Sequence, residues 1–139
     1  MVRVAVFGAN GRMGAEVCRA VEAADDLELV AAVDAGDPRD EVEAKAQVVV
    51  DFSVAAASRV AVPWLAMHGI HAVVGTTGFT DDDLAAFRTA FSGSNCLVAS
   101  NFAISAVLMM RFAELAAPQN PDSVVPRALA TRIRAGRRS

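Results

Sequence analysis

A segment near the N-terminus joins a buried strand, a glycine turn and a helix start, and it constrains the fold more than any other part of the sequence. The segment is Val4-Ala5-Val6-Phe7-Gly8-Ala9-Asn10-Gly11-Arg12-Met13-Gly14. The spacing GxxGxxG lets the backbone turn sharply, approach a phosphate without an intervening Cβ, and pack the helix closely on the strand. The N–H groups and the positive dipole end of such a helix face an anion. The segment therefore predicts a nucleotide pyrophosphate site.

Short valine-rich runs alternate with segments of helical period along the chain. This alternation favours repeated strand–helix units and a parallel sheet covered on both faces. We expect an α/β fold with a Rossmann-type doubly wound parallel sheet. The strands are expected at residues 2–7, 27–33, 47–52, 71–75 and 96–99.

The predicted helices begin and end at identifiable residues. The first follows the glycine turn and ends near residues 25–26. Ser53 is expected to cap the second, and Pro63 to kink or split it, because an interior proline costs about 3 kcal/mol. Thr80, followed by three aspartates, is expected to cap the third, and a last helix to run from residue 103 to before Pro118. The positions expected to face the core are Met13, Val17, Ala20, Val21, Ala24, Ala57, Val60, Ala61, Trp64, Leu65, Leu84, Phe87, Phe91, Ile104, Val107, Leu108, Phe112 and Leu115.

Length and charge predict one globular domain followed by a tail of different character. The 139 residues are 54% hydrophobic, which is enough for one core. Residues 1–117 carry eight Arg/Lys and fifteen Asp/Glu, whereas residues 118–139 carry five Arg and one Asp. We therefore expect a domain at 1–117 and a basic C-terminal tail at 118–139.

Several classes of partner are not expected from this composition. Basic residues in the domain are scattered and outnumbered, so no nucleic-acid surface is predicted. No segment has the pattern of a signal peptide or a membrane span, which favours a cytoplasmic protein. Cys18 and Cys96 have no metal-ligand spacing and are interpreted as free thiols, so no metal site is predicted. His68 and His71 are interpreted as structural.

Polar and glycine residues follow the predicted strands, where an open parallel sheet binds its ligands. Asp34 lies 20 residues beyond Gly14, the usual distance for a carboxylate that binds the ribose hydroxyls of an adenosine, although it also suits a turn. A carboxylate there favours NAD(H), while Arg12 beside the glycine turn could pair with a phosphate and admit NADP(H). The residues 75–78, Gly-Thr-Thr-Gly, suit either a cofactor contact or an ordinary connection, and Asn101 suits either a ligand contact or a helix cap.

Four segments together resemble the dihydrodipicolinate reductase family. They are VFGANGRMG, VVVDFS, GIHAVVGTTGFT and ASNFAISAVLMM, in that order over residues 1 to about 117. The resemblance implies an NAD(H)- or NADP(H)-dependent, tetrameric reductase of diaminopimelate and lysine biosynthesis that acts on a cyclic dicarboxylate. It also implies roles for individual residues. Pyrophosphate contacts are implied for Gly8, Ala9, Asn10, Gly11, Arg12 and Met13, a ribose contact for Asp34, nicotinamide-side contacts for Gly75, Thr76 and Thr77, and closure over the cofactor for Ala99, Ser100, Asn101 and Phe102.

The sequence also departs from the family pattern. The segment that supplies the family's catalytic acid, His-His-x-x-Lys-x-Asp-Ala-Pro-Ser-Gly-Thr, is not found here, so no catalytic residue is assigned and little or no reduction is expected from this chain alone. We expect most or all of the family's C-terminal substrate domain to be lacking. Two alternatives stay open: an NAD(P)-binding module without catalytic activity, and another GxxGxxG oxidoreductase.

Overall fold

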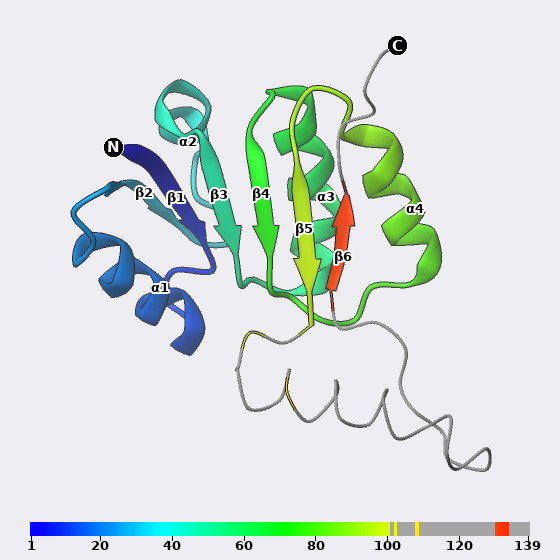
Figure 1. Ribbon diagram of the computed structural model, residues 1–139, viewed down its shortest axis with the longest axis horizontal. Coiled ribbons are helices and arrows are strands. Elements are labelled where there is room, and N and C mark those ends of the chain that lie inside the picture. The colour runs from blue at the N-terminus through cyan, green and yellow to red at the C-terminus, as the bar shows by residue number, and fades with distance from the viewer. Residues whose placement is uncertain (101, 103–107, 109–129, 134–139) are drawn as a thin grey trace.

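The computed structural model describes residues 1–100, 102, 108 and 130–133, and these residues form one sheet with helices packed against it (Figure 1). The sheet has six strands in the order β2-β1-β3-β4-β5-β6. The strands are β1 (Val2–Phe7), β2 (Leu27–Val33), β3 (Val48–Asp51), β4 (His71–Val74), β5 (Cys96–Ala99) and β6 (Ala130–Ile133).

The first five strands are parallel, which confirms the predicted α/β fold with a parallel sheet. Each predicted strand is present, although β3 and β4 are shorter than expected at their ends. The sixth strand, β6, pairs antiparallel with β5. Because these five strands are parallel, their carboxyl ends all lie at one edge of the sheet, the lower edge in Figure 1.

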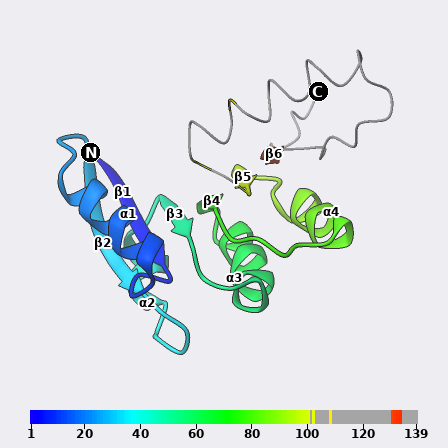
Figure 2. The same cartoon turned by 90° about the horizontal axis from the view of Figure 1, so that it is seen from below.

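Four helices connect the parallel strands. They are α1 (Arg12–Glu22), α2 (Asp40–Lys45), α3 (Ala55–Met67) and α4 (Asp81–Ala90). Helices α3 and α4 lie side by side on one face of the sheet (Figure 2). The short helix α2, with Val42 buried, has no counterpart among the predicted helices.

Helix α3 corrects three expectations. It begins after Val54 and not at Ser53, whose hydroxyl instead donates to the carboxylate of Asp51. It continues through Pro63 as one helix, so the split alternative is wrong. Val60 was expected to face the core but its exposed fraction is 65%. The buried positions are Ser58, Ala61, Val62 and Leu65, spaced i, i+3, i+4 and i+7, because the helix is oriented so that Ser58 reaches Asp51.

Two further positions of α1 face solvent where the core was predicted. Met13 is 48% exposed and Ala20 is also exposed, whereas Val21 is buried. Helix α1 packs on β1 and β2 near the edge of the sheet, so only a narrow stripe of it is covered. The expected last helix, from residue 103 to before Pro118, lies outside the described residues except for Leu108.

The core lies between the sheet and α3 and α4. Its largest fully buried apolar side chains are Phe87 of α4, Phe91 directly after α4, and Leu65 of α3, which confirms the inward positions predicted for them. Thr80 caps α4 as predicted: its side chain accepts from the backbone N–H of Asp83, whose carboxylate accepts from the N–H of Thr80. This capping box fixes the point at which the chain leaves the loop after β4 and enters α4.

Within the described residues, no helix is long and apolar enough to cross a lipid bilayer. The same part of the chain contains no group of three or more His, Cys, Asp or Glu side chains arranged to hold a metal ion.

Candidate functional site

The glycine turn after β1 has the geometry that its spacing predicted. Gly8 has a φ of +73°, and a Cβ there would lie 2.8 Å from the backbone of Phe52 and of Ser53. A Cβ on Gly14 would overlap the carbonyl group of Gly8. The first glycine therefore permits the left-handed turn beside the loop after β3, and the last permits α1 to pack against the turn.

The N-terminus of α1 has no side-chain cap. Gly11 is the N-cap residue, and the first turn of the helix contains no acidic residue. Its leading N–H groups therefore have no carboxylate or hydroxyl of their own helix end as acceptor. This arrangement, next to a glycine turn, suits a bound anion.

Asp34 lies beside the same turn, at the end of β2. Its two carboxylate oxygens accept from the backbone N–H of Asn10 at 3.1 and 3.3 Å. Asp37 accepts from the backbone N–H of Asp34 at 2.8 Å, so Asp34 also takes part in a local turn. Asp34 thus starts a turn, as one of its two interpretations predicted, and it also places its carboxylate against the glycine loop.

A small cleft of about 30 Å³ lies between the ends of β1, β2 and β3. It contains residues of the glycine turn, the carboxylate of Asp34, and Ser53 from the next loop. The lining residues are Phe7, Gly8, Val33, Asp34, Ala35, Arg39, Ser53, Ala57 and Ala61. Three loops that are far apart in the sequence therefore share one hollow at the carboxyl edge.

Asp51, the last residue of β3, is fully buried and lies at the centre of a hydrogen-bond network that the sequence did not reveal. Its Oδ1 accepts from the N–H and hydroxyl of Ser53 at 2.9 and 2.6 Å, and its Oδ2 accepts from the hydroxyl of Ser58 at 2.7 Å. Thr76 joins the network, because its hydroxyl donates to the carbonyl of Ser53 at 3.3 Å. The network joins the loops after β3 and β4.

The loop after β4 packs tightly against the loop after β3. A Cβ on Gly75 would overlap the ring of Phe52. Thr76 is buried with its hydroxyl directed toward Ser53, whereas Thr77 is exposed at the edge. Of the two threonines predicted to contact a ligand, only Thr77 presents its side chain to solvent.

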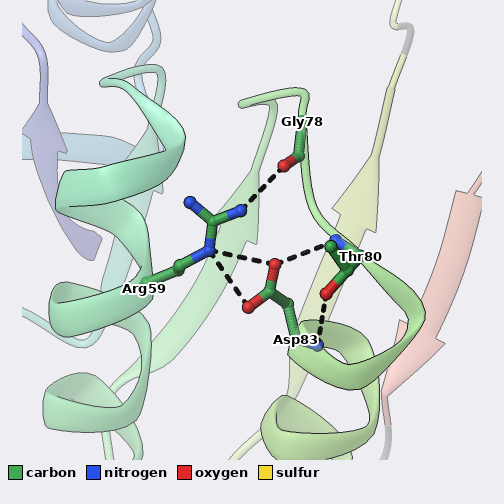
Figure 3. Close-up of polar contacts among 4 residues, drawn as sticks. All are labelled: Arg59, Gly78, Thr80 and Asp83. Carbon is green, nitrogen blue, oxygen red and sulfur yellow. Dashed lines mark hydrogen bonds and ion pairs between the residues drawn. The ribbon is translucent and has the colours of Figure 1, made fainter.

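Helices α3 and α4 hold the far end of this loop, as Figure 3 shows. The Nε of Arg59 lies 3.0 Å from both carboxylate oxygens of Asp83, and its Nη2 donates to the carbonyl of Gly78 at 2.9 Å. The hydrogen bond from the N–H of Thr80 is the largest cause that lowers the pKa of Asp83, and the guanidinium of Arg59 lowers it further. The loop is thus fixed at Thr76 by the buried network and at Gly78 by Arg59.

The segment after β5 is described in part. Ala99 is buried at the end of β5 and Ser100 is exposed at the same edge. The ring of Phe102 is 44% exposed and meets the ring of Phe52 edge-on, with centroids 5.7 Å apart. Asn101 lies outside the described residues. Phe52 thus contacts both the loop after β4 and the segment after β5.

The structure brings the predicted residues into neighbouring positions. Gly8 and Asp34 share the cleft, and Asn10 bonds to Asp34. Ser53 lines the cleft and its carbonyl accepts from Thr76, so the loop after β4 lies next to the cleft. Arg12 is exposed on the first turn of α1.

Both histidines lie at the opposite edge of the sheet, since His71 is the first residue of β4 and His68 follows the end of α3. The Nδ1 of His71 accepts from the N–H of Asn95 at 3.0 Å, and the Nδ1 of His68 lies 2.8 Å from the carbonyl of Trp64.

Burial raises the pKa of the Cys96 thiol to about 12, with a smaller contribution from the charge of Asp51. This cysteine and the two histidines pack the structure and do not contribute to the cleft.

Comparison with known proteins gives one consistent result. The sequence model of the family described as dihydrodipicolinate reductase, N-terminus, matches residues 2–102. The chain is 59% identical over 121 residues to a 4-hydroxy-tetrahydrodipicolinate reductase of Thermobifida fusca, covering 85% of this chain and 49% of the relative. It is 52% identical over 120 residues to the enzyme of the same name from Cutibacterium acnes, covering 84% and 48%. The chain thus spans about half the length of the curated relatives it matches.

A solved structure agrees with the sequence matches. It is a dihydrodipicolinate reductase from Paenisporosarcina sp. TG-14 with dipicolinate bound. The two folds superpose with a TM-score of 0.74 at 34% sequence identity, over 88% of this chain and 56% of that one.

Proposed function

The chain belongs to the dihydrodipicolinate reductase family, and on this premise we propose that it binds NAD(H) or NADP(H) at the carboxyl edge of its sheet, as the cofactor-binding part of a 4-hydroxy-tetrahydrodipicolinate reductase. The observation that carries this proposal is the uncapped start of α1 beside the cleft that contains Asp34. An anion site and a carboxylate next to it match the pyrophosphate and ribose of a dinucleotide. The family model and the curated relatives confirm the resemblance found in the sequence as a family relationship.

The proposed contacts follow the order of the loops. The leading N–H groups of α1 and the turn before it hold the pyrophosphate, with Gly8, Ala9, Asn10, Gly11, Arg12 and Met13 as the contacting residues. Asp34 accepts from a ribose hydroxyl of the adenosine. Gly75, Thr76 and Thr77 border the nicotinamide side. The buried hydroxyl of Thr76 holds the backbone of this loop in place through its bond to the carbonyl of Ser53. Ala99, Ser100, Asn101 and Phe102 close over the cofactor.

The residues of this chain position the cofactor for its chemistry. When bound, the nicotinamide supplies a hydride for an unsaturated cyclic dicarboxylate, a substrate class favoured by the dipicolinate in the related structure. Asp51, Ser58 and Arg59 hold the two loops that border the nicotinamide side. We propose that residues 1–117 form this cofactor domain, that it works in the cytoplasm, and that it acts within a homo-oligomer.

Calorimetric titration of the full chain with NADH and NADPH tests the proposal. A cofactor that binds only the folded chain raises the free energy of unfolding by RT ln(1 + [L]/Kd), where [L] is the concentration of free cofactor. The increase is about 2.7 kcal/mol when [L] is 100 times Kd. Asp34→Asn is expected to weaken NADH binding roughly tenfold, because a hydrogen bond to a charged group contributes about 1.5–3 kcal/mol. Asp26→Asn, at an exposed turn before β2, is the control and should leave binding unchanged.

Absence of binding by both cofactors would contradict the proposal. A separate assay follows NADH absorbance with the freshly prepared cyclic substrate. Binding with little or no oxidation of NADH is the expected result for this chain alone, and rapid oxidation would show that the expectation of low activity is wrong.

A further inference from the structure

We propose that Asp51 is a positioning residue for the nicotinamide half of the cofactor, and that its buried carboxylate acts on Thr76 through two serine residues. This inference rests on the proposed function and deepens it, because it names the group that shapes the nicotinamide side. Asp51 was not among the residues for which the sequence implied a cofactor contact.

The carboxylate of Asp51 is fully buried, and it needs hydrogen-bond donors because a buried charge without them is costly. Three donors meet it. They are the N–H and the hydroxyl of Ser53, at 2.9 and 2.6 Å, and the hydroxyl of Ser58, at 2.7 Å. A carboxylate only accepts hydrogen bonds, so each serine turns its single hydroxyl proton toward Asp51. The carboxylate therefore fixes the direction of both hydroxyl groups as well as their positions.

The two serines in turn hold Thr76. Its hydroxyl donates to the carbonyl of Ser53 at 3.3 Å and lies 3.3 Å from the hydroxyl oxygen of Ser58. The backbone carbonyl of Asp51 lies 3.5 Å from the same hydroxyl and accepts from the N–H of Gly75 at 2.9 Å. The side chain and the main chain of Asp51 thus hold two consecutive residues of the loop after β4.

This loop needs such a tether to keep one conformation. It begins and ends with Gly75 and Gly78, and glycine allows many backbone conformations that are costly to order. With Thr76 held inside, where it is 7% exposed, the next side chain, Thr77, lies exposed at the carboxyl edge. Polar groups that are already fixed bind a ligand more tightly, because no ordering cost is paid on binding. The buried carboxylate therefore prepares the loop for the nicotinamide.

The effect should be confined to one half of the cofactor. Thr76 follows β4, whereas Asp34, the proposed ribose contact of the adenosine, follows β2. Strands β1 and β3 lie between these two in the sheet. A change in the hydroxyl of Thr76 is therefore expected to weaken contacts with the nicotinamide and to spare those with the adenosine.

The test compares, in the full chain, the dissociation constant of each reduced cofactor with that of its fragment without nicotinamide. The fragments are ADP-ribose for NADH and 2′-phospho-ADP-ribose for NADPH. Thr76→Val keeps the branched shape but removes the hydroxyl, and it should weaken the cofactor about 3- to 10-fold and the fragment less than about twofold. Thr76→Ser retains the hydroxyl and should recover most of the cofactor affinity.

Three further variants locate the effect. Ser58→Ala should reproduce the selective loss of Thr76→Val. Asp51→Asn should do so as well, because its amide NH₂ group replaces an acceptor and one serine must turn its proton away. Thr89→Val, whose lost hydroxyl bonds only to Ala85 of the same helix, is the matched control and should change neither constant. If Asp51→Asn does not fold, the variants of Ser58 and Thr76 carry the test, because both leave the carboxylate in place.

Fluorescence of the bound reduced nicotinamide gives a second measurement, which should change in Thr76→Val and return in Thr76→Ser. Full cofactor affinity in Thr76→Val would overturn the inference, because Thr76 would then only fill space. Equal losses for cofactor and fragment, or a wild-type chain that binds the two equally well, would also overturn it and leave the proposed function intact. A wild-type chain that binds neither cofactor would overturn both.

Discussion

Arg59 of α3 and Asp83 of α4 are joined by a guanidinium–carboxylate pair in which one nitrogen lies 3.0 Å from both carboxylate oxygens. The same guanidinium holds the carbonyl of Gly78, and the same carboxylate completes the cap of α4 (Figure 3). One ion pair therefore connects two neighbouring helices to the loop that precedes the second of them. The pair lies at the surface, where solvent screens it, so its contribution to stability is modest and requires that Asp83 be ionised.

Asp83→Asn should lower the free energy of unfolding at neutral pH, and the difference from wild type should disappear in acid. The folded pKa of Asp83 is lowered from 3.8, so its stabilising effect is fully present above pH 3.8 and is lost as the pH falls through the lower folded value. Denaturant unfolding of wild type and variant, between neutral pH and pH 2, measures the difference. Asp82→Asn, exposed in the same helical turn, is the control. A difference that persisted at the lowest pH would contradict this account.

Gly14→Ala should destabilise the chain strongly, because its new methyl group would overlap the carbonyl of Gly8. Overpacking of this kind costs about 1–3 kcal/mol. Gly93→Ala, where no atom lies within 4 Å of the added carbon, should change the free energy of unfolding by less than about 0.5 kcal/mol. If the two variants had equal stability, the close approach of α1 to the glycine turn would be wrong.

Leu65→Ala and Val60→Ala test which face of α3 is buried. Leu65 is fully buried and its truncation should cost about 2–5 kcal/mol, whereas Val60 is exposed and its truncation should cost less than about 0.5 kcal/mol. Urea unfolding monitored by circular dichroism measures both. A large loss at Val60 would favour the helix orientation expected from the sequence over that of the structure.

Asp51→Ala should cost more than the loss of one hydrogen bond. The buried hydroxyl of Ser58 and the part-buried N–H and hydroxyl of Ser53 would lose their acceptor, and a buried polar group left unsatisfied costs about 1–3 kcal/mol. Asp25→Ala, at an exposed turn, is the control for loss of charge alone. Equal unfolding free energies for the two variants would show that the network contributes no net stability.

Cys96 should resist alkylation in the folded chain. Its thiol is buried and its pKa is raised to about 12, so almost no thiolate forms at pH 8. Cys18 is half-buried and its pKa is also raised, mainly by burial, so it should react faster than Cys96 but more slowly than a free thiol. Mass spectrometry after timed exposure to iodoacetamide, with and without denaturant, measures both rates. Modification of Cys96 at the rate of Cys18 in the folded chain would contradict its burial.

The sequence alone was sufficient for features set by local rules. Valine-rich runs between helical segments predicted the parallel strands, because each pattern reports which faces of an element are buried. Two further features were predictable because each is defined by residues only a few positions apart. They are the cap formed by Thr80 and Asp83 and the glycine turn from Gly8 to Gly14.

The tertiary structure decided features that depend on residues far apart in the chain. Nothing near Ser53 or Ser58 indicates that both bind the buried carboxylate of Asp51, yet this contact moves the start of α3 to Ala55 and turns Val60 outward. Arg39 has no motif of its own and gains its place in the cleft only when Phe7 and Trp64, from a strand and a distant helix, come together around it. Local patterns specify which elements form, whereas helix orientation and the charges that share a cleft follow from side-chain contacts that exist only after the sheet has assembled.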